Sequence, residues 1–400
     1  MKDNQPTLGR GRLLWALGLG GFLVNADNRA IAPMLPAIAG VFHTTASTAA
    51  LLVTAYSIPY GLFQLVYGPI ADRAGKVRTI LFSLALFSLG TLACGIVHAF
   101  SWLLVLRIIT GMFAAGIIPT TLAKIGDLYS LNERPRAIAF FMSLSTSGQA
   151  MGIVIGGLVA QFASYRFLFL LLGVAAIPTL WTLRRQRDEE PAAGRETLPL
   201  LKRYLTLVQL KRAWLIYGLV FCEGFVFYAG FTFLGVYGVE ELHLSYLVIG
   251  LLTATYSLGA FVGSRTITRI IGRLGASRMP LFGAFLMTLG FAAVWAWTNV
   301  AALTTGFIVL GLGFSYCHST LQTYATDLLP KARATAVSIF AFSLFLGSGI
   351  GPVAAGSLYD RFGFSGLLGT VTVGMALFGC CCAALLRVQA AARHRTDLSK

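Results

Sequence analysis

The sequence predicts an all-α integral membrane protein, with twelve transmembrane helices in two pseudo-symmetric six-helix bundles. Three observations lead to this fold class. Of the 400 residues, 56% are hydrophobic and 12% are charged, which is about half the charged fraction of soluble domains. Apolar runs of roughly 20 residues, long enough to span a bilayer, recur along the whole chain. Several short motifs of the first half recur in the second half at a nearly fixed offset.

The basic residues follow the order of these apolar runs. Lys and Arg lie mostly in alternate loops and near the two ends of the chain, as the positive-inside rule predicts for the cytoplasmic side. The net charge of +16 therefore indicates membrane topology and not a nucleic-acid partner. Both termini are expected in the cytoplasm. The predicted spans are residues 13–36, 47–70, 79–98, 101–123, 137–160, 167–183, 213–236, 246–267, 280–298, 301–325, 335–358 and 365–386.

A charged, proline-containing stretch divides the chain almost in half. Residues 184–212 are expected to be a cytoplasmic linker between an N-terminal bundle, residues 1–183, and a C-terminal bundle with a cytoplasmic tail, residues 213–400. Its end, LLKRYLTLVQLKR, is expected to form a short amphipathic helix on the inner membrane surface. The repeated motifs, offset by 199 or 200 residues, are Gly75 and Arg78 with Gly275 and Arg278, Asp127-Leu128 with Asp327-Leu328, and Gly148 and Gly152 with Gly347 and Gly351.

The first apolar run contains an acid at its centre, and the fourth contains a base. Asp27 lies roughly 22 Å along a helix that rises from Arg12, and Arg107 lies roughly 9 Å below the outer end of a descending helix. In a hydrocarbon core about 30 Å thick these depths nearly coincide. We therefore expect an ion pair between Asp27 and Arg107. The pair either serves packing alone or tunes a carboxylate that gains and loses a proton.

The helical phase separates Asp27 from its polar neighbours. Asn25, Asn28 and Arg29 share one helix face, which we expect to line a cavity. Asp27 is directed away from Asn25 and Arg29, between helices.

Two titratable residues lie within apolar runs of the second half. Glu223, flanked by Phe and Tyr in the seventh span, is a candidate proton carrier or a site for a cationic substrate, with a structural hydrogen bond as the alternative. His318, in the tenth span, is either a proton-coupling residue or a packing residue.

The loop after the second span, GPIADRAGKVR (68–78), resembles the loop signature of the major facilitator superfamily, and the resemblance covers essentially the whole chain. It implies the two-bundle fold of that family. It also implies a latch in which Asp72 meets a helix start of the other bundle and Arg73 joins Asp127 after the fourth span. The implied latch residues are Gly68, Asp72, Arg73, Gly75, Lys76, Arg78 and Asp127.

Two further motifs resemble proton-coupled drug exporters of the same superfamily. Arg107, Gly111 and Ala115 match an Arg-x-x-x-Gly-x-x-x-small pattern in the fourth span. The fifth span resembles an antiporter glycine motif, although Ile153 replaces its proline. The glycines of this motif are Gly148, Gly152, Gly156 and Gly157.

The resemblance implies a twelve-span drug:proton antiporter: a secondary active transporter that exports small lipophilic molecules by alternating access. The alternatives are a transporter of a polar metabolite, such as a sugar or an organic acid, and a lipid flippase. We expect no enzymatic activity, no catalytic or metal site and no cofactor, with the proton gradient as the energy source. The expected partners are a small-molecule substrate, protons and the lipid bilayer, for a monomer in a bacterial cytoplasmic membrane. Side chains on the helices expected to line the cavity are Tyr56, Tyr60, Gln64, Phe113, Tyr228, Phe231, Tyr256, Tyr316 and Gln322.

Overall fold

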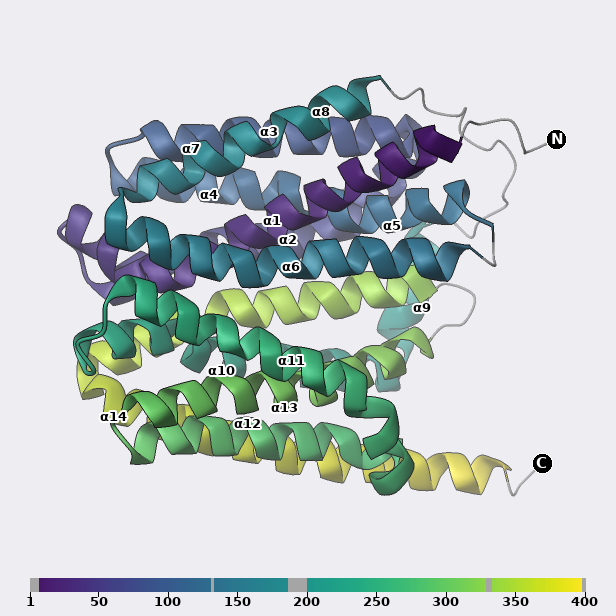
Figure 1. Cartoon of the computed structure of the whole chain (residues 1–400). Coiled ribbons are helices and arrows are strands. Elements are labelled where there is room, and N and C mark those ends of the chain that lie inside the picture. Colours follow the sequence, from purple (N-terminus) through teal and green to yellow (C-terminus); the bar gives the residue numbers. More distant parts are fainter. Residues whose placement is uncertain (1–6, 131–132, 186–199, 329–332, 398–400) are drawn as a thin grey trace. The chain divides into compact units, whose positions relative to one another are not determined.

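The chain forms two compact units, Met1–Leu200 and Leu201–Lys400, each built from helices (Figure 1). The computed structural model describes residues 7–130, 133–185, 200–328 and 333–397. Across these ranges all regular structure is helical, which confirms the predicted all-α class. The division between the units falls inside the predicted linker, of which residues 186–199 lie outside the described ranges.

Six membrane-length segments make up the N-terminal unit. α4 and α5 follow one another as the segment Phe100–Leu128, and α7 and α8 as Tyr165–Arg184. α1 continues through two prolines to Val41, five residues beyond its predicted end, since membrane helices can satisfy the backbone groups that a proline frees. The helices are α1 (Thr7–Val41), α2 (Ala46–Ala74), α3 (Lys76–Ile96), α4 (Phe100–Ala114), α5 (Ile117–Leu128), α6 (Arg134–Phe162), α7 (Tyr165–Ala175) and α8 (Ile177–Arg184).

The C-terminal unit begins with the short helix that the sequence predicts at the end of the linker, and six membrane segments follow it. The last two segments are joined in α14, where Gly363 breaks the helix with a φ of 63°. Without this break, the 50-residue segment Thr335–Ala384 would extend about 75 Å, far beyond the bilayer core. The helices are α9 (Leu200–Gln209), α10 (Lys211–Glu240), α11 (Tyr246–Leu274), the short 3-10 helix η1 (Ala276–Arg278), α12 (Met279–Ala296), α13 (Val300–Thr326) and α14 (Arg333–Asp397).

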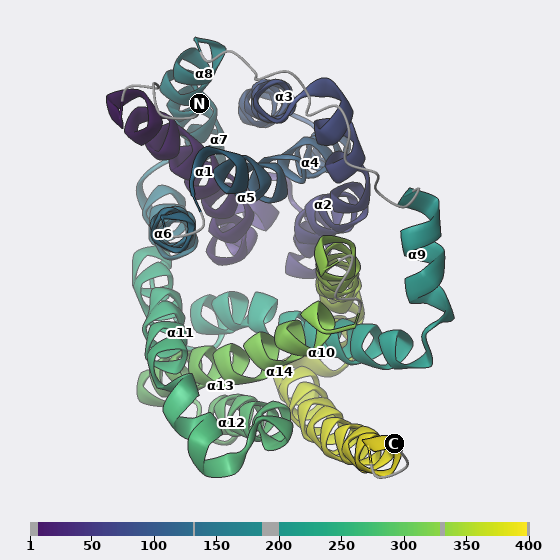
Figure 2. The same ribbon diagram turned by 90° about the vertical axis from the view of Figure 1, so that its right-hand side faces the viewer.

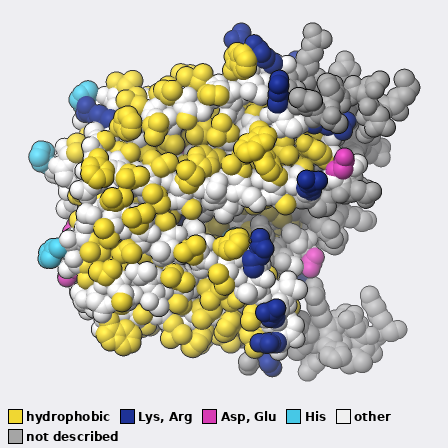
Figure 3. Space-filling model, in the orientation of Figure 1, with side chains coloured by type: hydrophobic (Ala, Val, Ile, Leu, Met, Phe, Trp, Pro, Cys, Tyr) yellow, Lys and Arg dark blue, Asp and Glu magenta, His cyan; other side chains and the backbone are white. Residues whose placement is uncertain are grey.

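The surface of each unit fits a lipid surrounding. In the described part of the chain, ten helical segments are long and apolar enough to cross a membrane. With α1 added and the last segment divided at Gly363, the spans number twelve, as predicted. Side chains such as Phe162 (74% exposed) and Trp102 (64% exposed) point outward. Figure 3 shows a broad hydrophobic surface on each unit, with most Lys and Arg gathered near one end.

Glycines bring α1 and α6 into close backbone contact. These two helices lie next to each other in the view along the helices (Figure 2). A Cβ atom on any of three α6 glycines would lie 2.3–2.5 Å from a carbonyl oxygen of α1, which leaves no room for a side chain. The pairs are Gly148 with Phe22, Gly152 with Ala26 and Gly156 with Ala30. The glycine motif thus fixes the helix that carries Asp27.

The same contact recurs in the C-terminal unit between α10 and α14. A Cβ atom on Gly347 would lie 2.2 Å from the carbonyl oxygen of Phe221, and one on Gly351 would lie 2.3 Å from that of Phe225. Both members of each pair are 199 residues beyond their counterparts in the N-terminal unit. The repeat seen in the sequence is therefore a repeat of helix packing.

Candidate functional site

A buried ion pair lies at the centre of the N-terminal unit. Arg107 of α4 donates from Nη1 to Oδ2 of Asp27 on α1 across 2.6 Å. The Asp27 side chain is 0% exposed and that of Arg107 is 1% exposed. This contact confirms the ion pair predicted from the depths of the two residues. Because an unpaired charge inside a membrane protein is costly, each residue makes the burial of the other tolerable.

Aromatic rings complete the surroundings of the arginine. The guanidinium carbon of Arg107 lies 4.3 Å from the ring centroid of Tyr56 on α2 and 5.7 Å from that of Phe169 on α7. Tyr56 is only 1% exposed, so it belongs to the ion-pair cluster and was wrongly expected to line a cavity. Phe169 was missed, because no local pattern distinguishes it from the other apolar residues of its span.

The close approach of α2 and α4 depends on Gly111. A Cβ atom at this position would lie 2.3 Å from the carbonyl oxygen of Tyr56. Gly111 follows Arg107 by one helical turn, so the glycine that admits the α2 backbone also places the Tyr56 ring against the guanidinium. The spacing of the Arg-x-x-x-Gly motif thus has a packing reason.

Three polar atoms of this cluster have no hydrogen-bond partner among the described residues. They are Oδ1 of Asp27, Nε of Arg107 and the hydroxyl oxygen of Tyr56. One carboxylate oxygen of Asp27 is thus bound by the arginine, and the other is buried without a hydrogen-bond partner among the described residues. Arginine keeps its charge in proteins, so a proton added to this pair would go to the carboxylate.

The polar face of α1 is only partly as predicted. Asn28 and Arg29 are partly exposed, in agreement with a face turned away from the helix contacts. Asn25 instead donates from Nδ2 to the Ser145 carbonyl oxygen at 2.9 Å and lies 2.8 Å from the Ser145 hydroxyl. It therefore ties α1 to α6, a role that the helical phase alone does not reveal.

Of the other candidates in this unit, Tyr60 is buried, and its ring stacks on that of Tyr56 at 5.8 Å between centroids. Tyr60 also forms a side-chain hydrogen bond with Gln64 and lies within electrostatic reach of Arg29. Gln64 and Phe113 are partly exposed, and Phe113 packs edge-on against Phe82.

A second buried pair lies in the C-terminal unit. Nδ1 of His318 on α13 is 3.0 Å from Oε2 of Glu223 on α10. The side chain of Glu223 is 0% exposed and that of His318 is 19% exposed. The sequence singled out both residues but not their contact, since 95 positions separate them.

Aromatic side chains surround this pair. Phe314 stacks on His318 at 4.9 Å, and it also meets Phe227 at 4.7 Å. Three of the predicted cavity residues belong to the same cluster: Tyr228, Phe231 and Tyr256. Phe227 and Phe314 were not predicted.

The remaining two candidates of this unit have other surroundings. Tyr316 stacks on Phe282 at 5.7 Å, and its hydroxyl lies 2.6 Å from that of Thr266. Gln322 is exposed.

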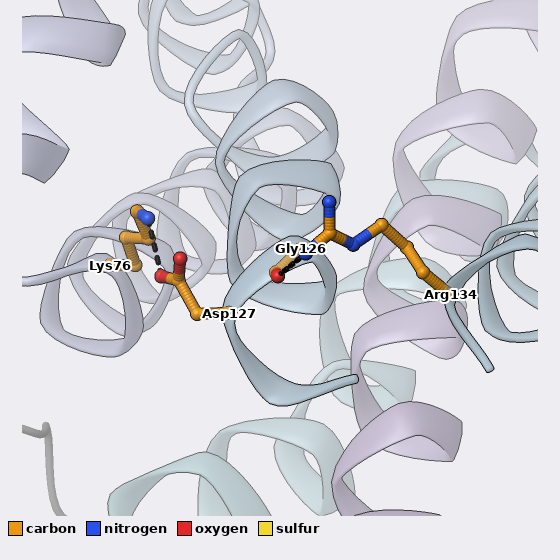
Figure 4. A network of polar contacts seen from close by, with 4 residues as sticks. All are labelled: Lys76, Gly126, Asp127 and Arg134. Carbon is orange, nitrogen blue, oxygen red and sulfur yellow. Dashed lines mark hydrogen bonds and ion pairs between the residues drawn. The ribbon is translucent and has the colours of Figure 1, made fainter. Parts of the chain in front are cut away.

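The predicted latch is corrected in one respect. The acid Asp127, at the end of α5, pairs with Lys76 at the start of α3 (Figure 4). Its partner is therefore not Arg73, which lies in the last turn of α2. Gly75, with a φ of 93°, separates the two bases and directs the chain from α2 into α3, which packs on α5. Asp72, Arg73 and Arg78 are exposed, and Gly68 has nothing within 4 Å of its Cβ position.

A second basic residue stabilises the same helix end. Arg134, at the start of α6, donates to the carbonyl oxygen of Gly126 (Figure 4). Cationic side chains are favourable near the negative end of a helix dipole, and here two of them offset the placement of an acid at that end.

Comparison with known proteins gives one family for the chain. The family model described as Major Facilitator Superfamily matches residues 17–248 and 239–400. Over 85% of this chain and 87% of the relative, the sequence is 26% identical to an uncharacterized MFS-type transporter, YceJ, of Bacillus subtilis (strain 168). It is 25% identical to a chloramphenicol resistance protein of Pseudomonas aeruginosa, over 77% of this chain and 75% of that protein.

Among solved structures, the chain resembles a bacterial homologue of the human lysosomal transporter Spinster in an inward-facing and unoccupied conformation. The TM-score is 0.78 at 19% identity, and the match covers 97% of this chain and 96% of the other. At this identity the likeness concerns the fold alone.

Proposed function

The chain belongs to the major facilitator superfamily, and we propose that it exports small lipophilic molecules across the membrane in exchange for protons. Membership makes it an integral membrane transporter and not an enzyme. The proposal adds the direction of transport, the coupling ion and the substrate class, and a bacterial cytoplasmic membrane as the location.

The observation that supports proton coupling best is the Asp27–Arg107 pair, with one carboxylate oxygen bound and the other unpartnered. A proton on Asp27 would cancel its charge and leave Arg107 as an uncompensated buried cation. Breaking a buried ion pair in this way is costly, by about 3–5 kcal/mol when one partner is lost. A penalty of this size is enough to shift a two-state equilibrium by more than a hundredfold.

The pair joins α1 to α4, and Tyr56 adds α2 to the same cluster. Protonation would therefore weaken the cohesion of three helices of the N-terminal unit. In the proposed cycle, a proton taken up from outside loosens this cluster and favours the inward-facing state, in which the proton leaves and substrate binds. Alternating access of this kind is usual for transporters built from repeats.

The substrate class rests on different support. Tyr256 and Phe314 are partly exposed members of an aromatic cluster in the C-terminal unit, and such rings favour flat, apolar molecules. One relative is named as a chloramphenicol resistance protein, which makes chloramphenicol the first compound to test.

One observation favours a second candidate, a transporter of organic acids or sugars. Asn28 and Arg29 lie partly exposed on α1, and an accessible cation suits a carboxylate better than an uncharged drug. A panel of matched acids, amines and neutral compounds separates the two candidates by which of them protects the protein from thermal unfolding.

The proposed function is tested with the full chain in proteoliposomes that carry an imposed pH gradient. Labelled chloramphenicol should accumulate on the acidic side, since each molecule exported against its gradient is driven by a proton moving down its own. Collapse of the gradient with a protonophore should abolish accumulation. Accumulation of neither chloramphenicol nor any lipophilic member of the panel, together with accumulation of acids, would favour the second candidate.

A further inference from the structure

The C-terminal unit carries a buried acid–base pair that the proposed cycle leaves unused. Oε2 of Glu223 contacts the imidazole of His318, and Oε1 has no hydrogen-bond partner among the described residues. The carboxylate thus has one bound oxygen and one unpartnered oxygen, as in Asp27. The difference lies in the base, since arginine keeps its charge whereas imidazole changes its charge near neutral pH.

This pair is not the repeat copy of Asp27 and Arg107. Gly111 faces the carbonyl oxygen of Tyr56, and Gly311 faces that of Tyr256 in the same way. Gly311 and Tyr256 each lie 200 residues after their counterparts, so the helix positions of the two units correspond. At the same offsets, Val226 stands in place of Asp27 and Phe307 in place of Arg107. Both are apolar, so the second unit has no ion pair at these positions. Its own acid, Glu223, lies one helical turn earlier on α10.

The groups that face the pair come from α13 itself and from the two other helices that pack on α10, namely α14 and α11. On α13 the thiol of Cys317 interacts with Glu223 and with Cys382 of α14. From α14, the Phe340 ring lies 5.1 Å from that of His318. From α11, Tyr256 reaches the rings beside the histidine. α12, which packs on α13, has no titratable side chain within its bounds. Thiols and phenols are ordinarily neutral at physiological pH, so the proton balance of this cluster rests on Glu223 and His318.

The two pairs differ in access. The side chains of Asp27 and Arg107 are 0% and 1% exposed, whereas His318 is 19% exposed and its partner Glu223 is 0% exposed. The imidazole is therefore the exposed member of its pair. A proton can reach Glu223 by way of the histidine ring, while Asp27 offers no comparable exposed partner in this conformation.

We propose that Glu223 and His318 together form a second proton-binding site, which titrates separately from Asp27 and exchanges its protons through the histidine. This site builds on the proposed proton-coupled function. From carboxylate and neutral imidazole, a first proton gives the ion pair of carboxylate and imidazolium. A second gives the neutral acid beside the imidazolium. The transporter then has one proton site in each unit, with different chemistry and different access.

The test is infrared difference spectroscopy of the reconstituted full chain, without substrate, titrated between about pH 5 and 8. The protonated-carboxyl band of the wild type should contain a component that E223Q removes and D27N leaves in place. H318Q should shift the pH at which this component appears by about one unit or more, because it removes the charged partner. H243Q, which removes an exposed histidine, is the matched control and should leave the carboxyl band unchanged.

An E223Q spectrum identical to that of the wild type in the carboxyl region overturns the proposal. So does an H318Q spectrum in which the Glu223 component keeps its wild-type pH, and this second variant decides the matter where E223Q does not fold. Since no substrate is used, the outcome is independent of the transport test. If the chain shows no proton-driven export, the Glu223 component can still be present in its spectrum. If the chain does show proton-driven export, that component can still be absent.

Discussion

Gly111 of α4 faces the backbone of Tyr56 of α2 so closely that a Cβ atom on the glycine would lie 2.3 Å from the tyrosine carbonyl oxygen. This approach holds the Tyr56 ring 4.3 Å from the guanidinium carbon of Arg107, whose Nη1 donates to Asp27. Helix packing and charge burial are therefore one arrangement in the N-terminal unit. In the C-terminal unit, Gly311 and Tyr256 keep the packing without the charges.

The repeat supplies a matched pair of glycine variants. G111A and G311A should each destabilise the protein by about 1–3 kcal/mol, because the added methyl group meets backbone and not a movable side chain. Only G111A should also impair proton-driven transport, since only there does the displaced helix carry the arginine of an ion pair. Thermal unfolding and proteoliposome transport measure the two effects. Equal loss of transport in both variants would contradict the prediction, because the loss would then follow from disturbed helix packing and not from the ion pair.

Tyr56 should act through its ring and not through its hydroxyl. Y56F keeps the ring over Arg107 and removes a buried oxygen without a hydrogen-bond partner, so its free energy of unfolding should stay within about 0.5 kcal/mol of the wild type. Y56L removes the cation–π contact and should cost about 2 kcal/mol or more. Thermal unfolding in detergent compares the two variants. Equal destabilisation would show that the hydroxyl is needed.

The Lys76–Asp127 contact should affect the transport rate more than stability. Both side chains are partly exposed, 22% and 42%, and such pairs contribute at most about 1 kcal/mol. K76A should therefore leave the unfolding temperature almost unchanged and alter the rate of substrate exchange, and the charge swap K76D/D127K should restore that rate. R73A is the comparison for the predicted but unobserved partner. If R73D/D127R restored exchange and K76D/D127K did not, the sequence-based assignment would hold after all.

The sequence was sufficient for the fold, because span length, basic loops and the repeat are properties of local composition and order. It also predicted the Asp27–Arg107 pair, since the depth of a residue in a membrane helix follows from its distance to the helix end. Contacts that depend on how helices rotate against each other were not predictable in this way. Asn25 was assigned to a cavity face and instead bonds to Ser145.

Two further outcomes have the same cause. Glu223 and His318 were considered separately, because helix order in the sequence does not say which faces of α10 and α13 meet. Lys76 replaced Arg73 as the partner of Asp127, because the turn at Gly75 places one base on α2 and the next on α3. The sequence thus identified these residues, but their partners could be identified only from the packing of the helices.

The central claim is that a proton on Asp27 drives transport. It is tested most directly by comparing wild type, D27N and D27E in proteoliposomes, with chloramphenicol or the best ligand of the panel as the labelled substrate. D27N should still exchange labelled for unlabelled substrate but fail to accumulate it against its gradient when a pH gradient is imposed, because an amide near Arg107 can neither gain nor lose the proton. D27E, which keeps the acid, should retain part of the accumulation. Uphill accumulation by D27N at the wild-type level would contradict the account.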